Sequence, residues 1–277
     1  MWIHLNVVDG TTVADILSYA LPGIGMITVA AIAVLFWRRL SGVAFRWFCV
    51  GVGLWAIGCT FKLLGALATN DPVVGFMKGN FPPFFLLLGW GLFCGVGSSV
   101  CEMGITWIAV LIWPQIGRDA TRAIGIGVGA GAFEALVIGL YFLIVIVAFT
   151  VGVPGLEEHW RNITNPPAFT PLVWLYPAAE RTIAILCHTS SRALILLGAT
   201  RKKPSLVFCG FSLFALMDGT ACAFLISKKL ETGSLWWLGL ACLPYALVSI
   251  PILRWCYMRW GDQKAHMKET TQMELQS

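Results

Sequence analysis

Charged side chains are scarce in this chain. Asp, Glu, Lys and Arg make up 12% of its 277 residues, whereas a soluble domain carries about 25%. Hydrophobic residues make up 58%, and the mean hydropathy is +0.79. This composition excludes an ordinary soluble globular protein and indicates a lipid bilayer as the main partner. The net charge of +5 reflects basic residues at the ends of apolar runs, so no nucleic-acid partner is expected.

Three absent motifs narrow the class further. No two of the nine cysteines have the CxxC spacing, so we expect small packing residues rather than disulfides or a cysteine metal site. The segment from Met1 to Gly10 has no basic residues apart from a histidine, which predicts no cleavable signal peptide. The last apolar run, residues 235–258, contains no lysine, which excludes a retinal Schiff base there.

Apolar runs long enough to cross a bilayer, about 20 residues each, fill most of the chain. We predict an all-α polytopic membrane helical bundle with about seven transmembrane helices. The expected spans are residues 17–37, 45–68, 83–113, 122–150, 172–199, 204–227 and 235–258. Residues 1–260 would then form a single transmembrane domain, and residues 261–277 a polar cytoplasmic tail.

The distribution of basic residues predicts the orientation. The segments after the first, third, fifth and seventh spans are rich in Lys and Arg, and the run Arg201-Lys202-Lys203 is interpreted as a topology anchor. The opposite segments hold few basic residues. We therefore predict an N-terminus outside and a C-terminus in the cytoplasm. The sequon Asn162-Ile163-Thr164 would then face outside, while the sequence does not indicate which membrane holds the protein.

Five acidic or histidine residues lie inside the predicted spans: Glu102, Glu134, Glu180, His188 and Asp218. A charge at mid-bilayer costs roughly 2.5–3.5 kcal/mol on insertion scales, so such residues pair inside a bundle or carry function. With a rise of about 1.5 Å per residue, all but Glu180 lie roughly 16–21 Å from the cytoplasmic end of their spans. We predict that these four side chains meet in one interior site.

The fifth span carries three basic or titratable residues on one face. Arg181, His188 and Arg192 are spaced by seven and four residues. Arg192 is therefore a candidate partner for a buried carboxylate: Glu102, Glu134 or Asp218. An ion-pair network that only fixes helix packing is equally compatible with this pattern. Lys62, near the outer end of the second span, is expected to extend its ammonium group towards the interface.

The fourth span begins with Gly125, Gly127, Gly129 and Gly131. Small residues four positions apart allow neighbouring helix backbones to approach closely in a membrane. The pattern predicts close packing of the helix that carries Glu134.

Four segments within residues 85–220 together resemble the YhfC family of intramembrane peptidases, which is distantly related to the CAAX prenyl-protein endopeptidases. They are Gly127-Val128-Gly129-Ala130-Gly131-Ala132-Phe133-Glu134-Ala135, Glu180-Arg181 with His188, Cys101-Glu102, and Phe214-Ala215-Leu216-Met217-Asp218. The resemblance implies Glu102, Glu134, His188 and Asp218 as candidate catalytic residues. Glu180, Arg181 and Arg192 would support them.

The chain departs from the family pattern at four motif positions. Cys101 replaces a glutamate, Ile105 an arginine, and Ala130 and Phe214 replace histidines. Because a metal-activated water needs about three protein ligands, the resemblance implies a catalytically degenerate peptidase with no cofactor, and a metal ion only if activity is retained. Such a protein would bind a membrane segment or a lipidated peptide among spans three to six.

A transporter is the alternative from a different functional class. A proton-coupled carrier would use Glu102, Glu134, His188 and Asp218 as a relay. Inverted repeats, which would favour a transporter, are not visible in the sequence.

Overall fold

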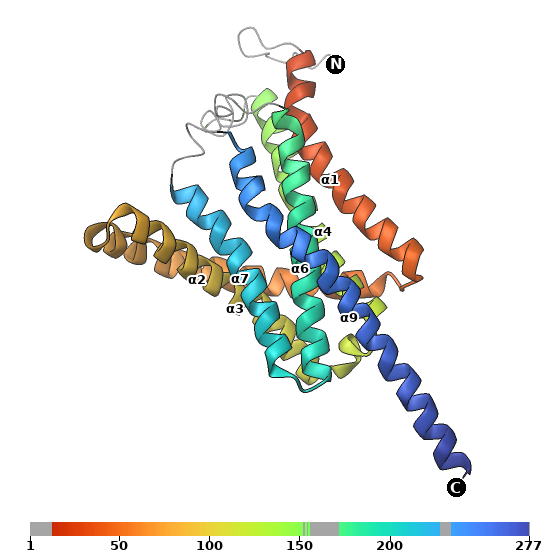
Figure 1. Cartoon of the computed structure of the whole chain (residues 1–277). Helices are drawn as coiled ribbons and strands as arrows, with labels where there is room; N and C mark the ends of the chain where they lie inside the picture. Colours follow the sequence, from red (N-terminus) through yellow and green to blue (C-terminus); the bar gives the residue numbers. More distant parts are fainter. Residues whose placement is uncertain (1–12, 152, 154, 156–171, 228–233, 277) are drawn as a thin grey trace.

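The computed structural model describes residues 13–151, 153, 155, 172–227 and 234–276. Within these residues every regular element is helical (Figure 1). The long helices are α1 (Val13–Ser41), α2 (Arg46–Asn80), α3 (Pro83–Ile112), α4 (Ala120–Thr150), α6 (Tyr176–Thr200), α7 (Pro204–Ile226) and α9 (Trp236–Gln276). Short 3-10 turns, η1 (Pro114–Gly117) and η2 (Val173–Leu175), precede α4 and α6.

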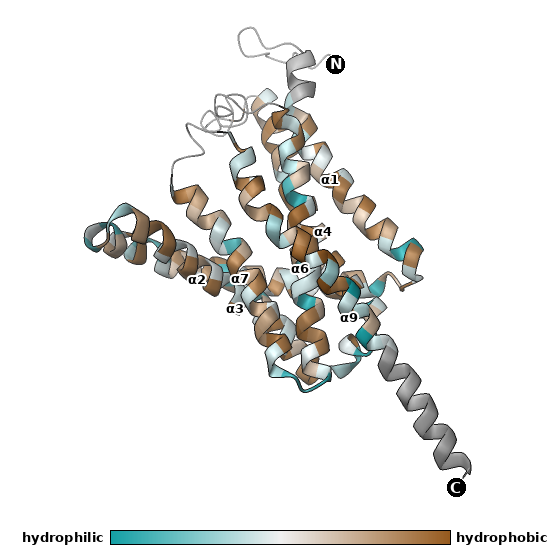
Figure 2. Ribbon diagram, viewed as in Figure 1, coloured by the Kyte–Doolittle hydropathy of each residue, from teal (hydrophilic) through white to brown (hydrophobic). Residues whose placement is uncertain are grey.

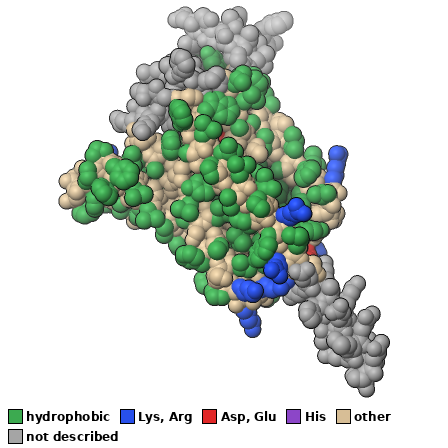
Figure 3. Space-filling model, in the orientation of Figure 1, with side chains coloured by type: hydrophobic (Ala, Val, Ile, Leu, Met, Phe, Trp, Pro, Cys, Tyr) green, Lys and Arg blue, Asp and Glu red, His purple; other side chains and the backbone are tan. Residues whose placement is uncertain are grey.

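All seven long helices contain a segment apolar and long enough to cross a membrane, as the sequence predicts. Side chains that face outward are mostly large and hydrophobic, such as Leu67, Phe208 and Ile112. Figure 3 shows hydrophobic side chains over the middle of one face, with Lys and Arg near its lower end and right edge. Because water would not stabilise such a surface, the chain is an integral multi-pass membrane protein.

Three helices are clearly longer than the predicted spans. Helix α1 extends the predicted span 17–37 by four residues at each end. Helix α2 continues through Asn70, Asp71 and Pro72 to Asn80, although this polar segment and its proline favoured an end near residue 68. The second half of α2 and the start of α3 project sideways from the bundle as a helical hairpin (Figure 1). Because α2 does not run parallel to the other helices, its length is not limited by the thickness of the bilayer. Helix α9 also continues, to Gln276, through the predicted polar tail.

Helix α6 is the centre of the bundle. In the apolar segment of α6 that could cross the membrane, 78% is buried inside the protein, against 11–28% for the corresponding segments of the other helices. It carries Arg181, His188 and Arg192 together with Thr189, Ser190 and Ser191, and most of its middle turns are polar or small. Because lipid cannot satisfy these groups, the surrounding α4, α7 and α9 must cover them. Figure 2 shows brown, hydrophobic residues on the surrounding helices and on the lower part of α6.

The glycines of α4 have the close-packing role that the sequence predicts. A Cβ atom at Gly127 would lie 2.6 Å from the Cα atom of Thr189, and one at Gly131 would lie 2.8 Å from that of Ile185, both in α6. On the opposite face, a Cβ atom at Gly129 would lie 2.3 Å from the carbonyl oxygen of Phe48 in α2. Helix α4 is therefore held between α2 and α6, and Glu134 reaches the central helix.

The nine cysteines are all free, and Cys49 and Cys209 are exposed rather than packed in the interior. The sequon at Asn162 lies outside the described residues.

The orientation of the termini stays a prediction. We expect a cytoplasmic C-terminus because Arg38, Arg39, Arg201 and Lys202 lie at helix ends on one side of the bundle. A C-terminal tag should resist protease added to intact cells and be removed only after the cells are permeabilised. Removal of the tag from intact cells would reverse the predicted orientation.

Candidate intramembrane site

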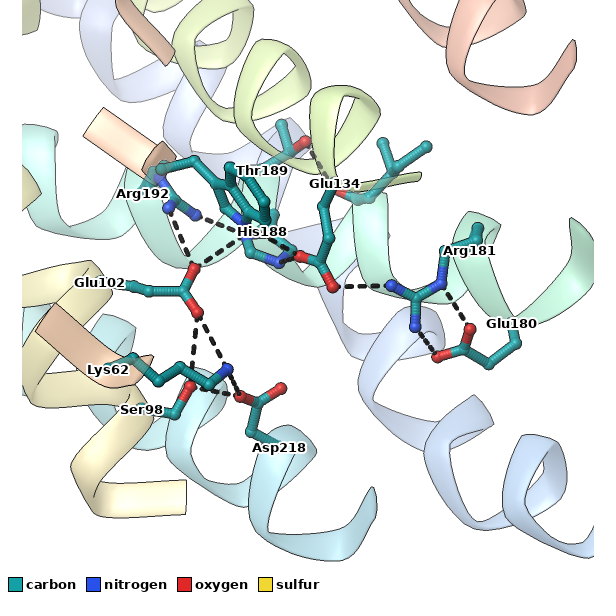
Figure 4. A network of polar contacts seen from close by, with 12 residues as sticks. Lys62, Ser98, Glu102, Glu134, Glu180, Arg181, His188, Thr189, Arg192 and Asp218 are labelled. Atoms are coloured by element: carbon teal, nitrogen blue, oxygen red, sulfur yellow. Dashed lines mark hydrogen bonds and ion pairs between the residues drawn. The ribbon is translucent and has the colours of Figure 1, made fainter. Parts of the chain in front are cut away.

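A continuous chain of polar contacts crosses the middle of the bundle (Figure 4). It brings together the four residues that the depth argument placed in one site, each from a different helix: Glu102 (α3), Glu134 (α4), His188 (α6) and Asp218 (α7). The three residues expected to support them, Glu180, Arg181 and Arg192, belong to the same chain of contacts.

His188 is the central residue of this network. Its Nε2 atom lies 2.6 Å from Oε2 of Glu134, and its Nδ1 atom lies 2.6 Å from Nη1 of Arg192. An arginine guanidinium has donors only, so Nδ1 must accept the hydrogen bond. We therefore assign the uncharged tautomer with its proton on Nε2, donated to Glu134. Both ring nitrogens are then engaged.

Glu102 lies between two cations in the buried middle of the network. Its Oε1 atom is 3.2 Å from Nζ of Lys62, and its Oε2 atom is 3.5 Å from Nη2 of Arg192. The same Lys62 ammonium lies 3.0 Å from Oδ2 of Asp218. Ser98, one turn before Glu102 on α3, donates its hydroxyl to Asp218. These contacts connect α2, α3, α6 and α7.

Glu134 connects α4 to the N-terminal half of α6. Its Oε1 atom accepts a hydrogen bond from Nη1 of Arg181 at 2.6 Å, and Arg181 also pairs with the neighbouring Glu180. The indole Nε1 of Trp55 in α2 donates to Oε2 of Glu134 at 3.2 Å. Glu134 therefore has partners on two helices, and a cation and an imidazole share its negative charge.

The network has a buried middle and two partly exposed ends. Glu102, His188 and Arg192 are almost completely buried, with side-chain exposures of 2%, 2% and 0%. Lys62 is 41% exposed, and Asp218 and Glu134 are 20% and 22% exposed. A molecule in the membrane could therefore reach the rim at Lys62, Asp218 and Glu134 but not the residues beneath it.

The prediction that Lys62 extends its ammonium group towards the interface is wrong. Its ammonium group does not extend to the interface but contacts Glu102 and Asp218 in the site. Ser98 and Trp55 were also missed, because neutral polar side chains carry no large insertion cost that would single them out in a sequence.

The donor set does not fit the zinc centre that retained peptidase activity would need. Both nitrogens of His188 are engaged, and the Phe214 ring packs edge-on against His188 with centroids 4.8 Å apart, where the family pattern has a histidine. Ala130 is fully buried and cannot ligate. Among the described residues, no group of three or more His, Cys, Asp or Glu side chains is arranged to hold a metal ion.

No family model matches this chain, and neither a curated protein nor a solved structure is detectably similar to it. The structure itself shows a multi-pass helical membrane protein with a polar network in its core.

Proposed function

We propose that this membrane protein has a peptidase-like scaffold whose site binds a membrane segment or a lipidated peptide without cleaving it. The engagement of both His188 nitrogens carries the proposal. A hydrolytic site needs an imidazole or carboxylate that can reach a water molecule and a substrate carbonyl. Here His188 and Glu102 are buried, and their partners are protein side chains.

The accessible rim supports binding from within the membrane. Lys62, Asp218 and Glu134 offer one donor group and two acceptor groups at mid-membrane depth. A groove of about 540 Å³ lies between α2, α3 and α7, lined by Phe61, Cys101, Ile105 and neighbouring apolar residues. Phe61 and Cys101 directly precede Lys62 and Glu102 in the sequence. A transmembrane helix with a local break has unpaired backbone groups, and an apolar groove next to polar side chains would accommodate both.

One specific observation favours the alternative function, a proton-coupled carrier. The network contains three cations: Lys62, Arg181 and Arg192. It contains four carboxylates: Glu102, Glu134, Glu180 and Asp218. With His188 uncharged, the carboxylates outnumber the cations by one. Binding of one proton would balance the charge, which is the chemistry that a proton-coupled carrier uses.

A binding and cleavage assay separates these functions. The purified protein would be incubated in detergent with fluorescent prenylated and transmembrane peptides, with and without a chelator. We expect peptide binding and no cleavage under either condition. Tightly bound zinc at one ion per chain, together with cleavage that chelator and His188→Ala both abolish, would contradict the proposal.

A matched pair of lysine variants locates the binding. Lys62→Met removes the rim ammonium, whereas Lys78→Met makes the same change on the exposed, projecting end of α2. We expect at least tenfold weaker peptide binding for Lys62→Met and no change for Lys78→Met. Equal binding by both variants would place the peptide elsewhere. Proton uptake driven by a pH gradient in liposomes, lost in Glu134→Gln, would instead support the carrier.

A further inference from the structure

An apolar groove runs along the outer surface of α3 and α7, separate from the polar network. Its volume is about 650 Å³. From α3 it is lined by Val96, Val100, Trp107 and Leu111, and from α7 by Phe208 and Phe211, among others. The α3 positions lie on one face of the helix, and the groove opens towards the lipid because Val100 and Phe208 are strongly exposed.

Two lysines stand at one end of this groove. Lys202 and Lys203, in the turn between α6 and α7, both line it and are both exposed. No ion pair within the described residues involves either lysine, whereas the adjacent Arg201 donates to the carbonyl oxygen of Arg259. The two ammonium groups are therefore available to a ligand.

The backbone of this turn does not explain the lysine at position 202. The N–H of Lys202 bonds to the carbonyl of Ala199, and that of Lys203 to the carbonyl of Gly198, which is the Schellman pattern at a helix C-terminus. Lys202 has a φ of 50°, in the left-handed region where glycine is the usual residue. The turn therefore does not require a lysine side chain at this position.

The length of the groove fits one leaflet of a bilayer. From Leu111 to Val96 on α3 is 15 residues, roughly 22 Å of helix, and from Pro204 to Ala215 on α7 is 11 residues, roughly 16 Å. Half of a hydrocarbon core of about 30 Å is about 15 Å. An acyl chain whose headgroup lies at the lysines would therefore extend along most of the groove.

We propose that this groove binds an anionic phospholipid, with one acyl chain between α3 and α7 and the phosphate headgroup at Lys202 and Lys203. Two cations beside an apolar groove are complementary to a lipid that carries a net negative charge, and juxtamembrane lysines attract such lipids. No residue of the polar network lines this groove, although it shares Val100, Trp107 and Phe211 with the groove assigned to the peptide.

Native mass spectrometry with defined lipids tests the charge part of the proposal. The purified protein would be titrated with phosphatidylglycerol and with phosphatidylcholine of the same acyl chains. We expect one tightly retained phosphatidylglycerol per chain, and roughly 30-fold weaker retention by the Lys202→Gln/Lys203→Gln variant. The control is Arg38→Gln/Arg39→Gln, which removes two charges from the last turn of α1 and should retain the lipid fully.

A second variant tests the acyl-chain part while leaving both lysines in place. Ser212 lines the groove and is only partly buried, so Ser212→Trp should fill it and lower phosphatidylglycerol retention at least tenfold. Thermal unfolding in lipid-free detergent would show that each variant is folded. Equal retention of the two lipids, or a loss in the lysine variant with none in Ser212→Trp, would overturn the proposal. Competition by inorganic phosphate at millimolar concentration would do the same, because it would show a simple anion site.

Discussion

Replacing Arg192 with methionine is expected to lower the free energy of unfolding by about 3–5 kcal/mol, the usual cost of removing one partner from a buried ion pair. The Arg192 side chain is completely buried. Its loss leaves Nδ1 of His188 without a donor and removes one of the two cations that face Glu102. Methionine is similar in length to arginine, so the variant creates little empty space. The loss of unfolding free energy therefore measures mainly the removal of the buried positive charge.

The measurement is unfolding in detergent with increasing denaturing surfactant, followed by circular dichroism. Arg254→Met is the control, because Arg254 is exposed on α9 and its replacement should cost less than about 0.5 kcal/mol. The double variant Arg192→Met/Glu102→Gln should recover part of the loss, since the uncompensated carboxylate is then gone. A double variant as unstable as the sum of the two single variants would show that Arg192 and Glu102 do not interact.

Much of the fold could be predicted because hydropathy decides where a chain crosses a membrane. The limits of α3, α4 and α7 agree with the predicted spans within one or two residues. The end of α2 could not be predicted, because its position depends on the departure of the α2–α3 hairpin from the bundle (Figure 1). That departure is set by which helices pack together, and a hydropathy profile carries no such information.

The convergence of the site residues could be predicted from depth alone. It is costly to expose an ionisable side chain to lipid on any side of its helix. Because Glu102, Glu134, His188 and Asp218 lie at similar depths on neighbouring helices, a shared interior site is the simplest arrangement that avoids this cost. The partner of each residue could not be predicted in this way. The sequence left Arg192 with three possible carboxylates, and the structure pairs it with Glu102.

Lys62 shows why the prediction failed for one cation. A lysine on a transmembrane helix can usually extend its ammonium group to water at modest cost, and nothing in the hydropathy pattern of α2 excludes this. The close approach of α2 to α3 changes the outcome: a Cβ atom at Gly58 would lie 2.8 Å from the Cα atom of Glu102. One turn further along α2, Lys62 then reaches Glu102 and Asp218 more readily than the interface.

Replacing Gly127 with alanine is expected to destabilise the protein by about 1–3 kcal/mol, the typical cost of overpacking a close contact. The added methyl group would lie 2.6 Å from the Cα atom and 3.0 Å from the carbonyl oxygen of Thr189. Both are backbone atoms of the central helix, so no side chain can rotate away and α4 must move outward. Glu134, two turns along α4, would then lose its 2.6 Å contact with His188.

Gly125→Ala provides the matched control two residues earlier on the same helix. A Cβ atom there would lie 3.5 Å from the nearest atom, in the Val43 side chain, which is an ordinary van der Waals contact. This variant should be as stable as the parent, or more stable by up to about 1 kcal/mol, because alanine is the better helix former. Comparing the unfolding midpoints of both variants isolates the contact from helix propensity. If Gly127→Ala were no less stable than Gly125→Ala, α4 and α6 would not be in close contact, and the polar network that depends on this contact could not form as described.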